Sequence, residues 1–234
     1  MNNAPGQDNV NHPGSWPLYR ALVGVGVVCG LLIVSVFVLT GPVIARNEAA
    51  ALQRAVFQVL PGAVERASFT LGADERFHAA KEGDAIRDQV HAGYDADGRL
   101  VGVAIEAQGM GYQDVIRVLY GYAPDRQAIV GMHVLASKET PGLGDKIEKD
   151  PAFRANFEAL DVTIAANGQS LQRPIEAVKS GAKTLPSQVD GITGATISSK
   201  AIASILRNSS ARWVPLVYRL RAELEKTGGV DAGQ

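Results

Sequence analysis

The stretch Asp190-Gly191-Ile192-Thr193-Gly194-Ala195-Thr196-Ile197-Ser198 places a threonine hydroxyl on a glycine-containing turn directly before a predicted helix. Apolar residues recur at a spacing of four after this turn, which predicts a helix over residues 198–207 with one apolar face. Thr196 then lies at or near the N-cap, where unpaired backbone N–H groups and the positive end of the helix dipole favour an anion. Gly194 lets a ligand approach the backbone closely. The stretch is therefore a candidate phosphate-binding turn; the alternative is a threonine that only caps the helix.

A second motif precedes the first by about fifty residues and reads Glu139-Thr140-Pro141-Gly142-Leu143-Gly144-Asp145-Lys146-Ile147. Pro141 fixes one backbone dihedral, and the two glycines permit positive ones, so the loop can bend tightly against a planar ligand. Taken alone, the same residues also make an ordinary turn in which Glu139 and Lys146 are solvated charges.

Together the two motifs resemble those of FMN-binding domains. The first is similar to their flavinylation motif, in which an Asp and two or three variable residues precede Ser/Thr-Gly-Ala-Thr. The second closely resembles the loop that comes before this motif in the G subunit of Rnf-type electron-transport complexes. The resemblance covers about residues 18 to 210 and includes the segment 109–114. In that family a flavin transferase esterifies the phosphate of FMN onto the last threonine of the motif, which by position is Thr196.

The resemblance implies a binding site for covalent FMN and no catalytic residue, because the flavin itself performs the redox chemistry. Tyr112 is a candidate to pack on the isoalloxazine ring, although an exposed tyrosine in a turn is the commoner meaning of such a residue. Lys146 is a candidate partner of the phosphate or of the reduced flavin. With Thr196, the implied site residues are Tyr112, Glu139, Thr140, Gly142, Leu143, Lys146, Asp190, Thr193, Gly194 and Ala195.

The implied function is that of a membrane-anchored electron carrier in an Rnf-type complex, which couples electron transfer between ferredoxin and NAD to ion translocation. Its partners would be the membrane and iron–sulfur subunits of that complex and, during maturation, the flavin transferase. No independent enzymatic activity is expected. One alternative is the C subunit of the sodium-translocating NADH:quinone reductase, and only residues 145–147 and the compact chain favour the Rnf interpretation over it. A second alternative is a membrane-anchored assembly module without a redox cofactor, in which Thr196 is a helix cap.

The N-terminal region contains an apolar run that is long enough to cross a bilayer. Residues 21–45 carry no charge and lie between Arg20 and Arg46, and a span needs roughly 20 residues. Trp16 and Tyr19 stand where interfacial aromatic residues are expected. A cleaved signal peptide would have a shorter apolar region behind a basic start, whereas residues 1–19 contain no Lys or Arg. We therefore expect a retained transmembrane anchor helix over residues 18–46.

The membrane orientation follows from the resemblance and not from the charges. Arginines at positions 46, 54 and 66 lean slightly toward a cytoplasmic C-terminal domain. The family places this domain on the periplasmic side of the bacterial inner membrane, and we follow the family because large C-terminal domains translocate largely regardless of charge.

The rest of the chain reads as an α+β domain with a mainly antiparallel sheet and flanking helices. The expected organisation is a disordered tail (1–17), the anchor (18–46), a juxtamembrane helix (47–62), the FMN-binding domain (63–228) and a flexible tail (229–234). Alternation and turn residues predict strands over 89–94, 100–107, 115–122 and 128–135, with a further strand over 162–166. Helices are expected over 151–160, with Asp150 as its cap, and over 198–207 and 215–226, separated by residues 208–210.

Several functional classes are disfavoured by composition. Cys29 is the only cysteine, so the chain alone forms neither a disulfide nor a protein-ligated iron–sulfur cluster. The four histidines are scattered without metal-ligand spacing. The formal net charge of −1 and the lack of a basic patch argue against binding of nucleic acid.

Overall fold

The computed structural model describes residues 16–81 and 88–227. The chain divides into two compact units, one up to Ala49 and one from Ala50 onward, and each is described by itself. Of the predicted tails, residues 1–15 and 229–234 lie outside the described residues, and the first helix already begins at Trp16.

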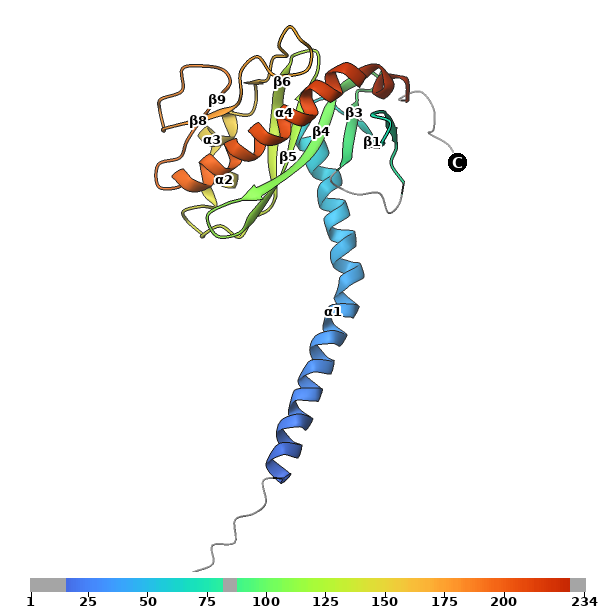
Figure 1. The fold of residues 1–234 in the computed structure, drawn as a ribbon, viewed down its shortest axis with the longest axis vertical. Helices are drawn as coiled ribbons and strands as arrows, with labels where there is room; N and C mark the ends of the chain where they lie inside the picture. Colours follow the sequence, from blue (N-terminus) through green and yellow to red (C-terminus); the bar gives the residue numbers. More distant parts are fainter. Residues whose placement is uncertain (1–15, 82–87, 228–234) are drawn as a thin grey trace, which may run out of the picture. The chain divides into compact units, whose positions relative to one another are not determined.

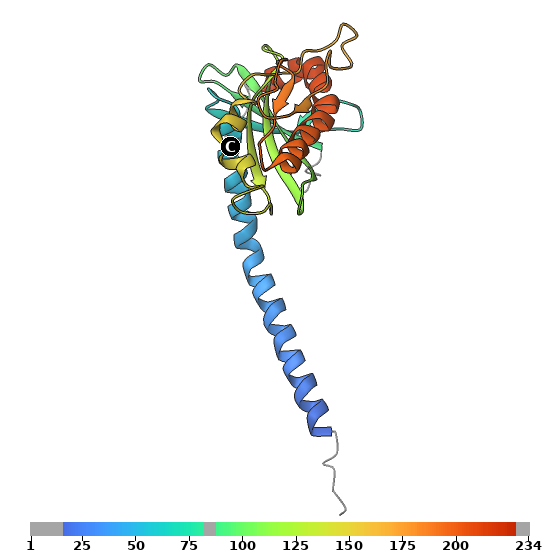
Figure 2. The ribbon, with the colours of Figure 1, turned by 90° about the vertical axis from the view of Figure 1, so that its left-hand side faces the viewer.

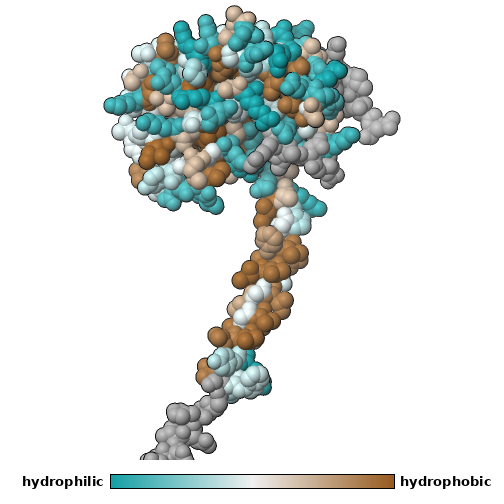
Figure 3. Space-filling model, in the orientation of Figure 1, coloured by the Kyte–Doolittle hydropathy of each residue, from teal (hydrophilic) through white to brown (hydrophobic). Residues whose placement is uncertain are grey.

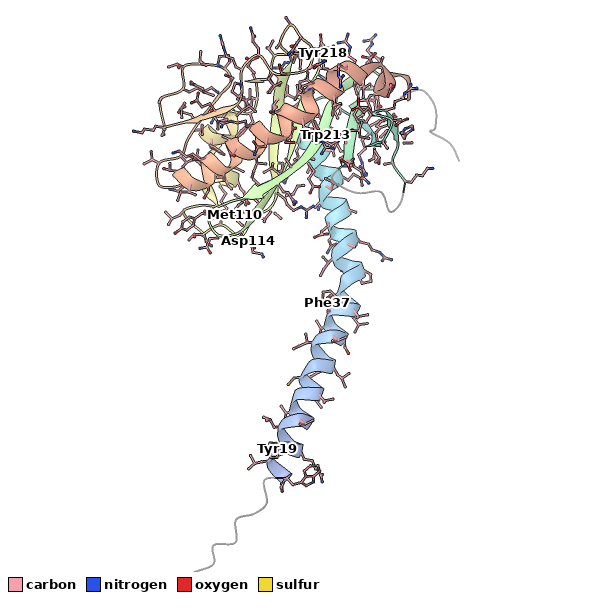
Figure 4. All side chains as sticks on the ribbon, in the orientation of Figure 1. Tyr19, Phe37, Met110, Asp114, Trp213 and Tyr218 are labelled. Carbon is pink, nitrogen blue, oxygen red and sulfur yellow. The ribbon has the colours of Figure 1, made fainter. Side chains whose placement is uncertain are left out.

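Helix α1 spans Trp16–Val59. Its residues up to Ala49 form the described part of the first unit, and its last ten residues belong to the second unit. The helix is long and apolar enough to cross a membrane, and Figure 3 shows hydrophobic residues along most of it. Tyr19 and Phe37 project from its surface (Figure 4) and are 62% and 77% exposed, as expected of side chains that face lipid. The sequence predicts an anchor and a separate juxtamembrane helix, whereas α1 runs without a break from one into the other.

The second unit is built on a seven-stranded antiparallel sheet with the strand order β2-β1-β3-β4-β5-β6-β7 (Figure 1). Its strands are β1 (Glu65–Leu71), β2 (Phe77–Ala79), β3 (Gln89–Tyr94), β4 (Leu100–Met110), β5 (Val115–Ala123), β6 (Ala128–Ala136) and β7 (Leu160–Asp161). The four strands predicted between residues 89 and 135 are therefore confirmed as β3 to β6. The mainly antiparallel α+β fold is confirmed with them.

The other elements are short, except for the last helix. They are α2 (Lys146–Lys149), α3 (Pro151–Ala155), the parallel pair β8 (Glu176–Val178) and β9 (Gln188–Asp190), and α4 (Thr196–Thr227). Asp150 caps α3 as predicted, since its carboxylate accepts hydrogen bonds from the N–H groups of Ala152 and Phe153. The helix predicted over 151–160 ends at Ala155, because the following residues turn into β7.

Two sequence predictions about regular structure are wrong. The strand predicted over 162–166 does not form, and only an isolated bridge joins Ile164 to Leu171 there. The two predicted C-terminal helices are one continuous helix, α4. Residues 208–210 do not interrupt it, because Ser210 is fully buried and donates a hydrogen bond to the carbonyl of Arg207, while the Ser209 hydroxyl meets that of Tyr120. These contacts of Ser209 and Ser210 thus outweigh their low helix propensity.

Both faces of the sheet are covered, and the period-two alternation of strands decides which side chain faces which layer. On one face, Val103, Ile105 and Tyr120 belong to the larger core, to which α4 contributes Ile202, Leu206, Trp213, Val217 and Leu224. On the other face, Ala104 and Leu119 pack with the end of α1 in a smaller core. Figure 2 shows α4 on one side of the sheet.

Glycines let the end of α1 lie directly on the strands. Gly121 and Gly131 are paired in register on β5 and β6. A Cβ atom at Gly121 would stand 2.0 Å from the carbonyl oxygen of Val59, and one at Gly131 would stand 2.6 Å from it. Any larger residue at these positions would therefore push the helix end off the sheet.

Candidate functional site

The predicted phosphate-binding turn forms the start of α4. Thr196 is the first residue of this 32-residue helix, and Gly194 has a φ of +86°, a conformation that glycine adopts without strain. The carbonyl of Ala195 accepts the first intrahelical hydrogen bond, from the N–H of Ser199, at 3.0 Å. The N–H groups of residues 196–198 therefore have no carbonyl partner within the helix. The Thr196 side chain is exposed beside them.

The second motif forms a tight turn after β6. The carbonyl of Thr140 accepts hydrogen bonds from the N–H groups of Leu143 (3.2 Å) and Gly144 (2.9 Å), and Gly142 has a φ of +80°. The turn leads into α2 at Lys146. Leu143 remains 52% exposed. The bend predicted from proline and glycine is thus present.

A third segment, the turn between β4 and β5, meets the other two. Tyr112 lies in this turn and is 62% exposed. The side-chain amide of Gln113 donates a hydrogen bond to the hydroxyl of Thr140 at 3.0 Å, which ties the turn to the second motif. Asp114 pairs with Lys138 at 2.6 Å, and this hydrogen bond holds the pKa of the Asp114 carboxyl below its usual range.

These three segments line one open cavity of about 380 Å³. The polar part of its wall comes from Thr196 and Ser198 at the start of α4 and from Glu139 and Thr140 of the second motif. The apolar part comes from Tyr112, Leu143 and Ile197. The full lining is Tyr112, Glu139, Thr140, Leu143, Gly144, Gly194, Ala195, Thr196, Ile197 and Ser198. Seven of the predicted site residues are therefore brought together: Tyr112, Glu139, Thr140, Leu143, Gly194, Ala195 and Thr196.

Exposed apolar side chains gather around this cavity. Among the described residues from Ala50 onward, seven large hydrophobic side chains are classed as exposed. Three of them, on Tyr112, Leu143 and Ile197, line the cavity. Two more, on Met110 and Val115, are paired in register where β4 ends and β5 begins, outside the cavity lining; Figure 4 shows Met110 at this end of the sheet, near Asp114. We call the three residues that line the cavity the apolar rim. Such clustering on a domain surface is typical of a binding site.

The other predicted site residues lie elsewhere. Lys146, Asp190 and Thr193 line a neighbouring cavity of about 480 Å³. The carboxylate of Asp190 accepts hydrogen bonds from the N–H groups of Gly181 (2.9 Å) and Ala182 (3.2 Å), so it secures the turn after β8. Gly142 is absent from both linings and acts through its backbone conformation.

Sequence reasoning missed residues that act over long sequence separations. Buried Asn156 accepts a hydrogen bond from the N–H of Asp190 at 2.9 Å and donates one to its carbonyl at 3.2 Å, which fixes the strand before the predicted phosphate-binding turn. Buried Ser198 is assigned from sequence only to the helix start, yet its hydroxyl donates a hydrogen bond to Glu139. Nothing local in the sequence signals either contact.

Comparisons with known proteins agree with this geometry. The FMN-binding domain family matches residues 111–210, which include all three segments of the cavity. The G subunit of the ion-translocating oxidoreductase complex of Cereibacter sphaeroides is 36% identical over 188 residues, which cover 79% of this chain and 75% of the relative. The chain belongs to this family of G subunits. A relative of the same name from Methanosarcina acetivorans is 34% identical over 122 residues, about half of each chain (51% and 55%).

A solved structure has the same fold. NqrC of Shewanella oneidensis superposes with a TM-score of 0.56 at 17% identity, over 76% of this chain and 99% of the other. This likeness concerns the fold alone. The family resemblance inferred from the two motifs is confirmed, as is an FMN-binding domain. With its long apolar helix, this member of the G-subunit family is a membrane-anchored protein.

Proposed function

We propose that this chain carries FMN covalently, through a phosphoester on Thr196, and relays electrons within an Rnf-type ion-translocating complex. The observation that carries the proposal is the position of Thr196. Its exposed hydroxyl stands at the first residue of a long helix and on the wall of a cavity with an apolar rim.

The phosphate of FMN fits the start of α4. A phosphodiester retains one negative charge, and the unpaired N–H groups of residues 196–198 with the positive end of the helix dipole stabilise an anion there. Such an interaction contributes roughly 0.3–1 kcal/mol when exposed and up to about 2 kcal/mol when partly buried. Ala195 has only a methyl side chain and is buried, which leaves the Thr196 hydroxyl open to solvent.

The flavin ring fits the apolar part of the cavity wall. The rim residues Tyr112, Leu143 and Ile197 offer an aromatic face and branched apolar side chains to a planar ligand. When bound, FMN supplies one- or two-electron redox chemistry, and the protein supplies attachment, orientation and electrostatic environment. The open cavity leaves the site accessible to a partner's redox centre.

The attachment step is a phosphoryl transfer to Thr196. The bond between Oγ1 and phosphorus forms as the bond from phosphorus to the leaving group of an activated FMN donor breaks. The hydroxyl proton passes to a base, and the leaving group keeps the electron pair of the broken bond. The flavin transferase supplies the donor and the base; this chain supplies the hydroxyl and the helix start that stabilises the remaining charge.

The partners and membrane side complete the proposal. The electron donors and acceptors are the membrane and iron–sulfur subunits of the complex, and the flavin domain lies on the periplasmic side of the bacterial inner membrane. A covalent link suits that side, because FMN lost outside the cytoplasm is not replaced by synthesis. Purification of the intact complex from its native membrane, with identification of the companion subunits, separates this proposal from a role as the C subunit of a sodium-translocating NADH:quinone reductase.

The attachment is tested by production of the full chain with its flavin transferase, followed by denaturation. Parent protein should keep its visible flavin absorbance and gain the mass of FMN less one water. Thr196→Val, which removes only the hydroxyl, should lose both signals. Thr184→Val is the matched control, because Thr184 is exposed but lies outside the motif and lines neither cavity, and it should keep both. Absence of flavin from the parent would refute the proposal and favour a membrane-anchored assembly module.

A further inference from the structure

Glu139 carries a buried carboxyl group at the junction of the three cavity segments. Its side chain is 6% exposed. One carboxylate oxygen, Oε1, accepts hydrogen bonds from the N–H groups of Tyr112 (2.8 Å) and Gln113 (3.1 Å). The other, Oε2, accepts one from the hydroxyl of Ser198. Both oxygens are thus occupied by protein donors, from the β4–β5 turn on one side and from α4 on the other.

Two glycines, Gly111 and Gly144, leave room for the Glu139 carboxylate between the loops. A Cβ atom at Gly111 would stand 2.4 Å from Oε1, and one at Gly144 would stand 2.7 Å from Oε2 and 3.1 Å from the Ser198 hydroxyl. Real Cβ contacts are essentially never shorter than 3.0 Å. The two loops can therefore close around the carboxylate only with glycine at these positions.

We propose that Glu139 is a positioning residue, which holds the Tyr112 turn, the Thr140–Gly144 turn and the start of α4 together as the walls of the flavin cavity. It acts through its hydrogen bonds to protein groups and makes no direct contact with the flavin. We call Glu139, its two N–H donors and Ser198 the clasp. The effect of the clasp on flavin binding rests on the proposed function, since the clasp keeps Tyr112 and Thr196 on the wall of the same cavity. Its geometry is independent of the flavin.

The clasp differs from a flavin ligand in how it responds to substitution. In Glu139→Gln, the amide oxygen can still accept from both backbone N–H groups, and the amide nitrogen can donate to the Ser198 hydroxyl. All three contacts then survive without the charge. Glu139→Ala removes all three and leaves the buried Ser198 hydroxyl without this acceptor, which is the costly case. Ser198→Ala cuts only the link to α4.

The first test uses the chain without flavin. Hydrogen exchange at the amides of Tyr112 and Gln113 should be roughly tenfold or more faster in Glu139→Ala than in the parent, because each amide loses its hydrogen-bond acceptor. Glu139→Gln should stay near the parent. Equal exchange in the parent and Glu139→Ala would overturn the clasp, and this holds even if the proposed function fails.

The second test measures flavin content after production with the transferase, by intact mass and by the visible absorption band of the bound flavin. Glu139→Gln should retain most of the flavin and an unshifted band, whereas Ser198→Ala and Glu139→Ala should lose flavin or shift the band. Leu60→Ala is the matched control, because Leu60 is buried in the smaller core on the other face of the sheet. It should lower the melting temperature without changing either readout. Loss in Glu139→Gln with full retention in Ser198→Ala would show a direct, charge-dependent flavin contact and overturn the proposal.

Discussion

Substitution of Gly121 by alanine tests how closely the end of α1 is held to the sheet. The added Cβ atom would stand 2.0 Å from the Val59 carbonyl oxygen and 2.8 Å from its carbon. To restore even the shortest contact that real Cβ atoms show, 3.0 Å, the helix end or the strand must move by about 1 Å. Overpacking of a core costs about 1–3 kcal/mol, and the upper end applies because the obstacle is backbone and cannot change rotamer.

The expected loss of about 3 kcal/mol corresponds to a fall in melting temperature of roughly 6–12 °C for a domain of this size. Thermal unfolding of the full chain in detergent, followed by the fluorescence of buried Trp213, measures it. Gly41→Ala is the control, since nothing beyond its chain neighbours and the nearby backbone of its own helix lies within 4 Å of a Cβ at that position in the anchor. A melting temperature unchanged by Gly121→Ala would refute the close packing of Val59 on β5.

Two further predictions concern buried side chains. Tyr122 has a buried hydroxyl without a hydrogen-bond partner among the described residues, whereas the Tyr120 hydroxyl lies 2.9 Å from that of Ser209. Thermal unfolding should therefore show that Tyr122→Phe is neutral or stabilising and that Tyr120→Phe destabilises the fold by about 1 kcal/mol. The reverse order would contradict these contacts. Burial lowers the pKa of His91 from 6.5 to about 4. Below pH 6.5 the unfolded chain therefore binds more protons than the folded one, and the free energy of unfolding should fall as the pH drops from 6.5 toward 4. Denaturant unfolding should show that this free energy depends less steeply on pH in His91→Gln, and an unchanged slope would rule out His91 as its source.

Local signals in the sequence are sufficient to predict the four central strands of the sheet. Alternating apolar residues and the turn residues at 95–98 and 123–126 predict β3 to β6, because each hairpin is specified within a few residues. The continuity of α4 was not predictable in the same way. Ser209 and Ser210 favour a break locally, and the burial of Ser210 and the hydrogen bond between Ser209 and Tyr120 keep the helix intact.

The same distinction holds for the site. The glycine turn before Thr196 and the bend at Gly142 are local, and both are present where the sequence predicts them. The clasp joins Glu139 to Ser198 across 59 residues and to the β4–β5 turn across 27. A single sequence contains no sign of such pairs, because they depend on how the strands and α4 pack.

The central claim is that Thr196 itself carries the flavin, and peptide fragmentation tests it most directly. Trypsin releases residues 184–200 as one peptide, since the chain has Lys183 before it and Lys200 at its end with no Lys or Arg between. This peptide contains six hydroxyl residues: Thr184, Ser187, Thr193, Thr196, Ser198 and Ser199. Tandem mass spectrometry of the flavin-bearing chain should place the added mass on Thr196 alone. A flavin on any of the other five, or on a different peptide, would contradict the account.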